Sequence, residues 1–380
     1  MRLYYHNSYI RQFEAQIVGI EGLNVFLDAT SFYPTSGGQP QDLGAINDIG
    51  VTAVEELEDG RIAHTMASPS ASGLAVCTID WKRRFDHMQQ HTGQHLLSAV
   101  FFDLFGFQTV SFHMGAEVST IDLAVASLTQ QQIEKAEYRA NEAICENREV
   151  TVSFEHAAVA ESLRKASARE GELRIVSIAG LDRSACGGTH VRATGEIGAI
   201  QIRKLDKIRG NVRLEFTCGQ RTVARTRRDF DALSTIARTF SSPLDETPAL
   251  VAAQIEAAKE ADKVRRKLAT ELALFQGKAL YERSPRHIAR GPITDDVRAL
   301  AQAFALHPNA VFLALSAEGF LLATAKDSGI NAGVLVKPLI AELGGRGGGS
   351  PQMAQGSLPH PEALRTFEQR ITADWPNESI

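Results

Sequence analysis

The stretch DHMQQHTGQHLLSAVFFDLFG, residues 86–106, decides how the fold of this chain is interpreted. Its pattern is helical, so we predict one helix here, with Asp86 as the N-cap and Gly106 as the stop. On that helix His91 and His95 are four residues apart and share one face, where they can offer two ring nitrogens to a single ion. The stretch therefore predicts half of a metal site.

The second half of that site lies in the sequence CGGTH, residues 186–190. Cys186 and His190 have the same four-residue spacing, and the two glycines between them allow the backbone to fold tightly. One thiolate and three imidazoles form a tetrahedral set that suits zinc. The two motifs together predict a zinc site and suggest a zinc hydrolase.

Each motif has a simpler interpretation when it is taken alone. HxxxH pairs occur on many helices, and His87 with His91 would form another pair on the same stripe. Cys186 by itself can be a buried structural cysteine beside a turn. The predicted metal site therefore depends on the two motifs in combination.

The segments around the helix predict a mixed architecture. Residues 1–80 alternate short apolar and polar stretches broken by Gly and Pro turns, which favours a small antiparallel β-barrel. Residues 81–220 favour a mixed α+β domain that contains the metal motifs. Its other expected elements are a helix over residues 129–148 and strands at residues 119–123, 150–154, 173–178, 199–205 and 212–217.

Residues 221–284 predict a helical linker with one break at residues 241–243. Its second helix repeats apolar residues at three- and four-residue steps, as in a coiled-coil seam formed by Ala261, Val264, Leu268, Leu272 and Phe275. A helix packed on its own domain explains the same pattern. A homodimer through this linker is compatible with the seam.

Residues 285–380 predict a C-terminal domain. Two strands are expected at residues 310–315 and 319–325, joined by a tight turn at residues 317–318. A helix around residues 331–343 then leads into a Gly-rich run.

Composition places this chain among soluble globular proteins. At 380 residues we expect two to four domains, and the 44% hydrophobic and 22% charged content is ordinary. The chain has no signal-peptide core and no apolar run of membrane length, so we expect a cytoplasmic protein without membrane contact. Four scattered cysteines fit a reducing compartment. The net charge of −5 means that any RNA contact must use local basic patches.

A third motif is the run TSFYPTSGGQPQDLG, residues 30–44. Its Gly-Gly-Gln tripeptide is similar to the loop that release factors use on peptidyl-tRNA, although a β-turn explains the glycines adequately. In order with HTGQH and CGGTH, this run resembles the editing domain of alanyl-tRNA synthetase and its free-standing AlaX relatives. The Gly-rich run at residues 344–356 resembles the DHH-associated C-terminal domain of the synthetase.

The resemblance spans nearly the whole chain and implies a long-form AlaX protein, because the synthetase's class II catalytic domain has no counterpart here. The implied fold class is α+β: an N-terminal small β-barrel, an α+β zinc editing domain, a helical linker and a C-terminal DHH-associated α/β domain. The implied activity is hydrolysis of tRNA(Ala) that carries serine or glycine. Such editing is needed because a pocket built for alanine rejects glycine, one methyl smaller, by only ~1–3 kcal/mol.

By the same resemblance, the zinc ligands are His91, His95, Cys186 and His190. The ion would either lower the pKa of a bound water to ~7 for attack on the ester, or orient the substrate while water attacks from elsewhere. If all four side chains ligate, the first role needs a fifth position or a displaced ligand.

Two further residues are expected near the ester. Thr30 can help to recognise serine, although a barrel threonine satisfied by the backbone is the alternative. His113 falls where the synthetase's editing domain usually carries glutamine, and a core histidine is the alternative. The other predicted substrate contacts are Gly37, Gly38, Gln39 and Arg209.

We expect tRNA contacts from Arg265 and Arg266 in the linker and from Arg346 in the Gly-rich run, although a basic run is also typical of a solvated face. The Gly-rich run has neither the P-loop nor the dinucleotide fingerprint, so no nucleotide cofactor is expected. Two rival functions remain: a zinc editing enzyme for another tRNA, such as Ser-tRNA(Thr), and a non-catalytic tRNA-binding module.

Overall fold

The computed structural model describes residues 1–157, 163–164, 171–317 and 319–373. The chain divides into two compact units, Met1–Thr235 and Ile236–Ile380. The predicted barrel and α+β segments fall together in the first unit, so the finer division into four segments stays a prediction. Glu318, half of the turn predicted at residues 317–318, lies outside the described residues.

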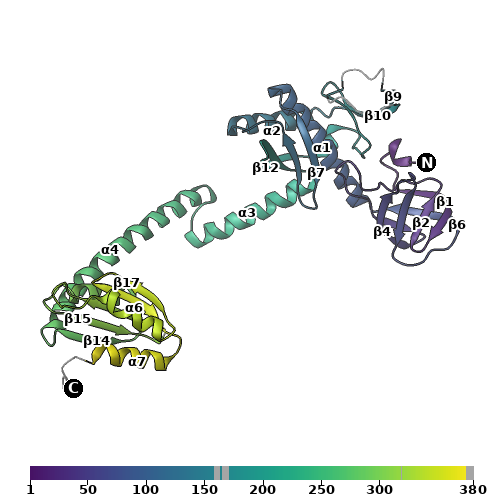
Figure 1. The fold of residues 1–380 in the computed structure, drawn as a ribbon. Coiled ribbons are helices and arrows are strands. Elements are labelled where there is room, and N and C mark those ends of the chain that lie inside the picture. The colour runs from purple at the N-terminus through teal and green to yellow at the C-terminus, as the bar shows by residue number, and fades with distance from the viewer. Residues whose placement is uncertain (158–162, 165–170, 318, 374–380) are drawn as a thin grey trace. The chain divides into compact units, whose positions relative to one another are not determined.

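The first unit begins with a short 3-10 helix, η1 (Leu3–Tyr5), followed by a closed barrel, drawn in purple and blue in Figure 1. The strand order around the barrel is β1-β2-β5-β4-β3-β6, and all neighbours are antiparallel. Alternate residues such as Ala15, Ile17 and Cys77 fill the interior. The predicted barrel is confirmed. Its strands are β1 (Gln12–Glu21), β2 (Asn24–Leu27), β3 (Gly44–Ile46), β4 (Ile49–Glu56), β5 (Ile62–Met66) and β6 (Gly73–Ile79).

The long helix α1 (Trp81–Phe105) follows the barrel directly. Its N-cap is Asp80, whose carboxylate accepts a hydrogen bond from the Arg83 amide, and Gly106 ends it in a left-handed conformation with φ 72°. The predicted stop is confirmed, but the predicted start at Asp86 is wrong because Asp80 caps the helix one and a half turns earlier. Asp86 instead forms an ion pair with Arg221 at 2.7 Å.

Two sheets and a second helix surround α1. The four-stranded sheet has the order β12-β13-β8-β7, and the three-stranded sheet has the order β11-β10-β9. The predicted strands and the second helix, whose Thr129 forms a capping box with Gln132, are confirmed within a few residues. The elements are β7 (Thr109–Met114), β8 (Ser119–Leu123), α2 (Gln130–Cys145), β9 (Val150–His156), β10 (Glu172–Ile178), β11 (Asp182–Ala185), η2 (Thr194–Ile197), β12 (Ile200–Ile208) and β13 (Asn211–Cys218).

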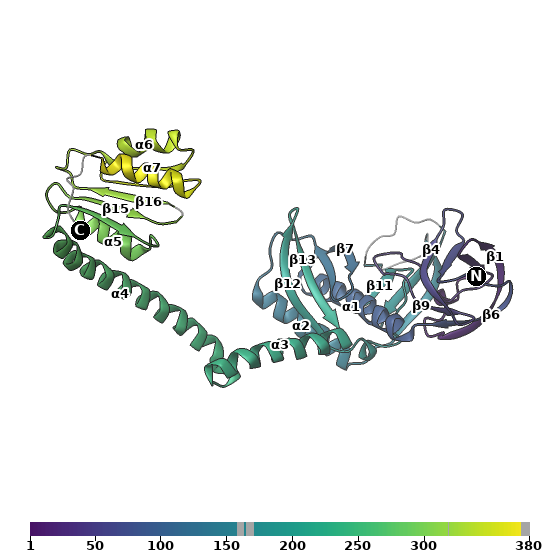
Figure 2. The ribbon, with the colours of Figure 1, turned by 90° about the horizontal axis from the view of Figure 1, so that it is seen from below.

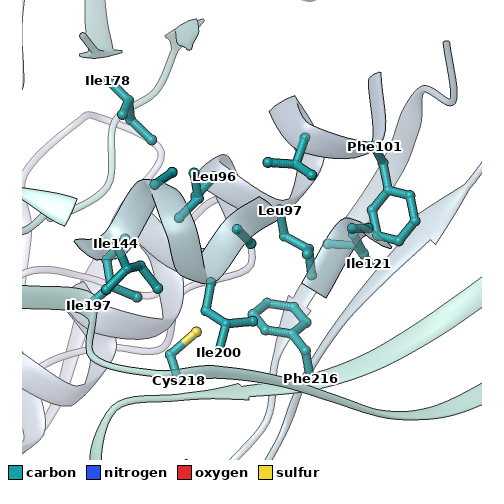
Figure 3. Close-up of a cluster of buried hydrophobic side chains, with 14 of the residues drawn as sticks. Leu96, Leu97, Phe101, Ile121, Ile144, Ile178, Ile197, Ile200, Phe216 and Cys218 are labelled. Carbon is teal, nitrogen blue, oxygen red and sulfur yellow. The ribbon is translucent and has the colours of Figure 1, made fainter. Parts of the chain in front are cut away.

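The main core of the first unit forms around α1 (Figure 3). Leu97 and Phe101 of α1 point toward Ile121 of β8, and Leu96 and Phe216 of β13 belong to the same cluster. All of residues 87–101 are buried, polar side chains included. A helix buried all round needs partners for its polar groups, and these partners create the metal site described below.

The break predicted at residues 241–243 is confirmed: it separates α3 (Gln220–Phe240) from η3 (Leu244–Glu246) and α4 (Thr247–Tyr281). The second unit is otherwise a five-stranded sheet in the order β14-β15-β16-β18-β17, with α6 and α7 on one face and α5 on the other (Figure 2). The predicted strands and helix of this segment are confirmed. Its elements are β14 (Arg286–Arg290), α5 (Asp295–Phe304), β15 (Val311–Leu315), β16 (Phe320–Thr324), α6 (Ala332–Glu342), β17 (Arg346–Gly349), β18 (Met353–Ser357) and α7 (Pro361–Thr372).

Helix α4 packs on its own unit through a face different from the predicted seam. Ala273 and Gly277 are buried, and a Cβ on Gly277 would lie 3.0 Å from the Phe304 amide of α5. The seam residues Leu268, Leu272 and Phe275 remain 58%, 56% and 77% exposed. In the described part of the chain, no helix is both long and apolar enough to cross a membrane.

Candidate metal centre

Four side chains from two distant segments converge beside the middle of α1. The ligand atoms that His91, His95, Cys186 and His190 can offer all lie within 4.8 Å of one another. The Cys186 Sγ lies 3.4 Å from the His91 Nε2 and 3.3 Å from the His190 Nε2. Metal–ligand bonds of ~2.0–2.3 Å in a tetrahedron place ligand atoms roughly 3.5 Å apart. The separations therefore fit a single zinc-sized ion.

The loop that follows β11 depends on a glycine to bring its two ligands in. A Cβ on Gly188 would occupy the space of the His91 ring, so only glycine allows the loop to approach α1. A Cβ on Gly187 would make only an ordinary contact with the Tyr5 hydroxyl, at 3.6 Å. Among the described residues, packing therefore requires a glycine at position 188 but not at position 187.

Each imidazole in the cluster uses its Nδ1 for a different partner. The His91 Nδ1 donates to Gln39 Oε1 at 2.8 Å, and the His190 Nδ1 donates to Thr92 Oγ1 at 3.1 Å. The His95 Nδ1 donates to Asp182 Oδ2 at 2.8 Å. All three Nε2 atoms are therefore left facing the cluster, which is the tautomer that a metal-binding histidine needs.

Gln39 connects the barrel segment to both halves of the site. Its Oε1 also accepts from the Thr189 amide at 3.1 Å, and its Nε2 donates to Thr189 Oγ1 at 2.9 Å. The Gly38 carbonyl accepts from the Met114 amide at 3.0 Å, and a Cβ on Gly38 would lie 2.7 Å from the Phe112 carbonyl. Gly37 has a positive φ of 57°. The tripeptide lies against the candidate metal ligands and β7, and its predicted contact with the substrate stays a prediction.

The electrostatics of the cluster favour the metal-binding forms of Cys186 and His190, whereas His95 has to lose a proton. Burial opposes ionisation of Cys186, but the three surrounding imidazoles hold the pKa of its thiol well below the usual range. Burial lowers the pKa of His190 to about 3, so its ring is neutral. Burial also disfavours protonated His95, yet Cys186 and Asp182 outweigh this and raise its pKa to about 9. A bound metal would displace that proton.

Asp182 is itself fixed in place. It is buried and pairs with Arg164 at 2.6 Å, and burial, which would raise its pKa, is outweighed by His95 and Arg164, which lower it to about 2. Asp182 and Thr92 were not among the predicted site residues. No spacing pattern distinguishes them from other acceptors, since a histidine's second partner can come from anywhere in the fold.

Comparisons with known proteins agree with this architecture. Residues 173–214, which include Cys186 and His190, match the family model for the second additional domain of threonyl and alanyl tRNA synthetases. Residues 290–374 match the DHHA1 domain. The chain is 31% identical to alanyl-tRNA editing protein AlaX-L of Pyrococcus horikoshii over 94% of each chain.

This chain belongs to the AlaX family of alanyl-tRNA editing proteins.

Other relatives of this AlaX family member match it over only part of their own length. It is 29% identical to alanine–tRNA ligase of Pyrococcus abyssi over 94% of this chain and 42% of the ligase. It is 36% identical to alanyl-tRNA editing protein Aarsd1-B of Xenopus laevis over 57% of this chain and 54% of that protein. A solved structure, the C-Ala domain of Aquifex aeolicus alanyl-tRNA synthetase, aligns with 23% of this chain and 90% of that chain at 21% identity, with a TM-score of 0.20.

In this AlaX family member the Thr30 hydroxyl is committed inside the barrel. It donates to His64 Nε2 at 2.8 Å and accepts from the Phe32 amide at 3.1 Å. The His64 Nδ1 donates in turn to the Val25 carbonyl at 3.0 Å. These bonds resemble the alternative given for Thr30, a barrel threonine satisfied by the backbone, except that one of its partners is a histidine side chain. The structure does not bring Thr30 into hydrogen-bond contact with the four ligands.

His113 and Arg209 lie apart from the four ligands. On β7 the ring of Phe112 stacks on His91 at 5.3 Å, so its neighbour His113, which is exposed, points to the opposite face of the sheet. Arg209 is exposed in the turn between β12 and β13. The other end of the eight-residue strand β13 contacts α1, which puts roughly 20–25 Å between that contact and the turn at about 3.3 Å per residue.

The predicted tRNA contacts lie on or near the second unit's surface. Arg265 and Arg266 are exposed on α4, and both pair with Asp262, at 3.1 and 2.8 Å. Arg346 is exposed at the start of the edge strand β17. It lines a cleft of about 890 Å³ together with Arg298 and Phe320.

Proposed function

We propose that this protein hydrolyses the ester of tRNA(Ala) mischarged with serine or glycine, in trans and with zinc. Membership of the AlaX family supports editing of alanyl-tRNA in general. The observation that carries the proposal is the cluster of three imidazoles and one thiolate, each imidazole held by its own acceptor. A closed set of four protein ligands is also typical of structural zinc, so the hydrolysis test below has to distinguish the editing enzyme from a binding module.

The donor set fits zinc, and His91, His95, Cys186 and His190 would hold it. When bound, the ion supplies a Lewis acid that can orient or polarise the ester carbonyl. Four protein ligands already complete a tetrahedron, so we favour this role over activation of a bound water. The chain's own contribution is to keep the three imidazoles aimed and the thiol ionised.

We propose that the cleft of the second unit contacts the tRNA backbone, with Arg346 as a phosphate partner. Arg346 is exposed and has no ion-pair partner within the described residues, whereas Arg290 of the same unit is paired with Glu368 at 2.5 Å. Arg346→Gln should weaken tRNA binding several-fold and lower the slope of log affinity against log salt by about one. Filter binding at several salt concentrations measures both, with Arg290→Gln as the matched control. An unchanged slope in Arg346→Gln would remove Arg346 from the interface.

We also propose that the exposed seam of α4 joins two copies of the chain. Its apolar groove is lined by Ala257, Ala261, Val264 and Leu268, with Glu260 and Arg265 beside them. A self-complementary helix pair would cover these side chains, which the chain itself leaves open to water.

The function is tested with four substrates: Ser-tRNA(Ala), Gly-tRNA(Ala), Ala-tRNA(Ala) and Ser-tRNA(Thr). We expect rapid loss of the ester from the first two and sparing of Ala-tRNA(Ala). Activity should disappear after chelation, return with zinc and be absent in Cys186→Ala. Preference for Ser-tRNA(Thr) would move the protein to the threonine system. Zinc-loaded protein that binds tRNA without hydrolysing any ester would leave only the binding module.

A further inference from the structure

Arg174 of β10 is a nearly buried cation beside the metal loop. Its side chain is 9% exposed. Its Nε donates to the Tyr5 carbonyl at 2.9 Å, and its Nη1 donates to the Cys186 carbonyl at 2.6 Å. The Cys186 amide donates to the Arg174 carbonyl at 3.0 Å. Arg174 therefore lies one hydrogen bond from the backbone of a metal ligand.

Arg174 has no acidic partner among the described residues. The other strongly buried arginine, Arg84, is paired with Asp42 at 2.5 Å, and Arg164 is paired with Asp182. A buried charge without a counterion is costly, and proteins usually pair it. Arg174 is therefore the one of these three arginines without a carboxylate. The thiolate of Cys186 is the main group that favours its charge, and a bound metal would neutralise that thiolate.

One nitrogen of Arg174 is available for that purpose. Its Nη2 has no hydrogen-bond partner among the described residues, while Nε and Nη1 are both used. Among the described residues, the side-chain atoms that are both fully enclosed and without a partner are His87 Nδ1, Ser119 Oγ and Arg225 Nε. Arg174 Nη2 is not one of them, so it is not fully enclosed. The Nη2 therefore reaches the surface with its donors free.

The charge around Arg174 calls for an anion. A zinc ion bound to one thiolate would keep a net positive charge. The guanidinium of Arg174 lies near that charge because its Nη1 donates to the Cys186 carbonyl. Asp182 does not neutralise the pair, because it is already shared between His95 and Arg164. An anionic ligand here would interact with two positive centres at once.

An aromatic ring lies beside the same guanidinium. The Tyr5 ring centroid is 5.6 Å from the Cζ of Arg174 and 5.5 Å from that of Arg2. The position of the missing Cβ of Gly187 is 3.6 Å from the Tyr5 hydroxyl, and no described residue lies close enough to require glycine there. Nucleotides are commonly bound by a cation that contacts the phosphate and an aromatic ring beside it. Arg174 and Tyr5 provide both groups next to the candidate metal centre.

We propose that Arg174 binds the phosphate of the terminal nucleotide whose ester is hydrolysed at the metal centre, with Tyr5 beside it. This inference rests on the proposed function. The phosphate is the charged group of that nucleotide, and Nη2 is the donor that receives it. Arg174 then places the ester against the four ligands and binds the end of the RNA independently of the second unit.

The test uses 3′-(L-serylamino)-3′-deoxyadenosine, which cannot be hydrolysed, with and without a 5′-phosphate. Affinities are measured on the zinc-loaded full chain by calorimetry. In the unmodified protein we expect the phosphate to strengthen binding about tenfold or more, as a charge-assisted contact does. In Arg174→Met that gain should vanish, while the analogue without phosphate binds as before. In Arg174→Lys, which keeps the charge, part of the gain should remain.

Two controls separate a phosphate contact from a structural role. Arg61→Met, which removes a charge paired with Glu21 and Asp59 on the barrel, should keep the full gain. Zinc content and melting temperature report whether the Cys186 loop survives in each variant. If Arg174→Met or Arg174→Lys weakens both analogues equally, Arg174 is only structural and the proposal fails. If the unmodified protein binds both analogues equally, no phosphate site exists; if it binds neither, the proposed function fails as well.

Discussion

Gln39 is the residue that ties the barrel to the metal centre. Its single amide contacts His91 and both the amide and the hydroxyl of Thr189, so it reaches both pairs of ligands at once. Acceptors of this kind orient a metal-binding imidazole and fix its tautomer. A neutral amide on His91 and a carboxylate on His95 make the two helix ligands electrostatically different.

We expect Gln39→Leu to weaken zinc binding about 10–100-fold, because the His91 ring loses its acceptor. Gln39→Glu should recover most of that loss, since a carboxylate accepts from the same nitrogen. Competition with a chelator of known affinity gives the constants. Gln41→Leu, two positions along the same loop, is the matched control and should bind zinc normally. Normal zinc affinity in Gln39→Leu would show that the hydrogen bond does not hold the ligand.

The four side chains of the candidate metal site could be predicted from the sequence, whereas their hydrogen-bond partners could not. Helical geometry puts His91 and His95 on one face, and a four-residue spacing repeats in Cys186 and His190. The acceptors behind the rings come from 52 and 87 positions away, for His91 and His95 respectively. Only the packed structure decides which of many polar residues fills such a place.

The buried pair of Thr30 and His64 makes a prediction about pH. Burial lowers the pKa of His64 to about 4, below its ordinary value of 6.5. The unfolded chain therefore binds the proton more tightly, so the stabilisation is complete above pH 6.5 and is lost as pH falls toward 4. The loss should reach about 2 kcal/mol by pH 5. Unfolding in urea between pH 7.5 and 5 measures it, and His64→Asn should show a shallower dependence. An identical dependence in both proteins would contradict the assignment.

At the scale of elements, α1 approaches β13 closely because Gly93 has no side chain. A Cβ on Gly93 would occupy the space of the Cys218 Sγ, so the two elements approach as closely as glycine allows. The same contact is supported by Gln90, whose side chain bonds to the backbone amide and carbonyl of Cys218 at 3.0 Å each. These contacts fix the rotation of α1 about its own axis and therefore the direction in which His91 and His95 point.

Gly93→Ala should destabilise the protein by about 1–3 kcal/mol through overpacking, although alanine is the better helix former. Cys218→Ala creates the missing space, so the double variant should be more stable than the sum of the two single changes predicts. Urea unfolding of the four proteins gives this coupling. Cys77→Ala, another buried cysteine, is the control and should give no rescue. Additive effects of Gly93→Ala and Cys218→Ala would mean that the helix shifts freely.

Most elements could be predicted because their local patterns agree with their surroundings. The barrel, the second helix with its Thr129 cap and the break after α3 each have clear signals. The N-cap rule places the start of α1 too late because Asp86 satisfies this rule as well as Asp80 does. Asp86 pairs with Arg221, a residue 135 positions away. Local rules do not distinguish a capping carboxylate from one with a distant partner.

At the scale of the whole molecule, the exposed seam of α4 predicts a second copy. We expect the chain to sediment as a dimer at micromolar concentration, and Leu268→Glu combined with Leu272→Glu to make it monomeric. Leu306→Glu, at a leucine away from the seam that is 73% exposed, should leave the dimer intact. Sedimentation velocity measures all three proteins. A monomeric unmodified chain would show that the seam has another use.

The four candidate ligands come in two pairs, and 95 positions separate His91 from Cys186. An ion bound to both pairs closes a loop of that length, much as a disulfide would. In the chain-entropy picture such a closure removes about 4–5 kcal/mol of freedom from the unfolded state. Because proteases cleave unfolded chains, a bound ion would lower the rate of proteolysis in addition to its proposed role in ester hydrolysis. In a cell short of zinc, the first consequence would be a shorter lifetime for newly made molecules.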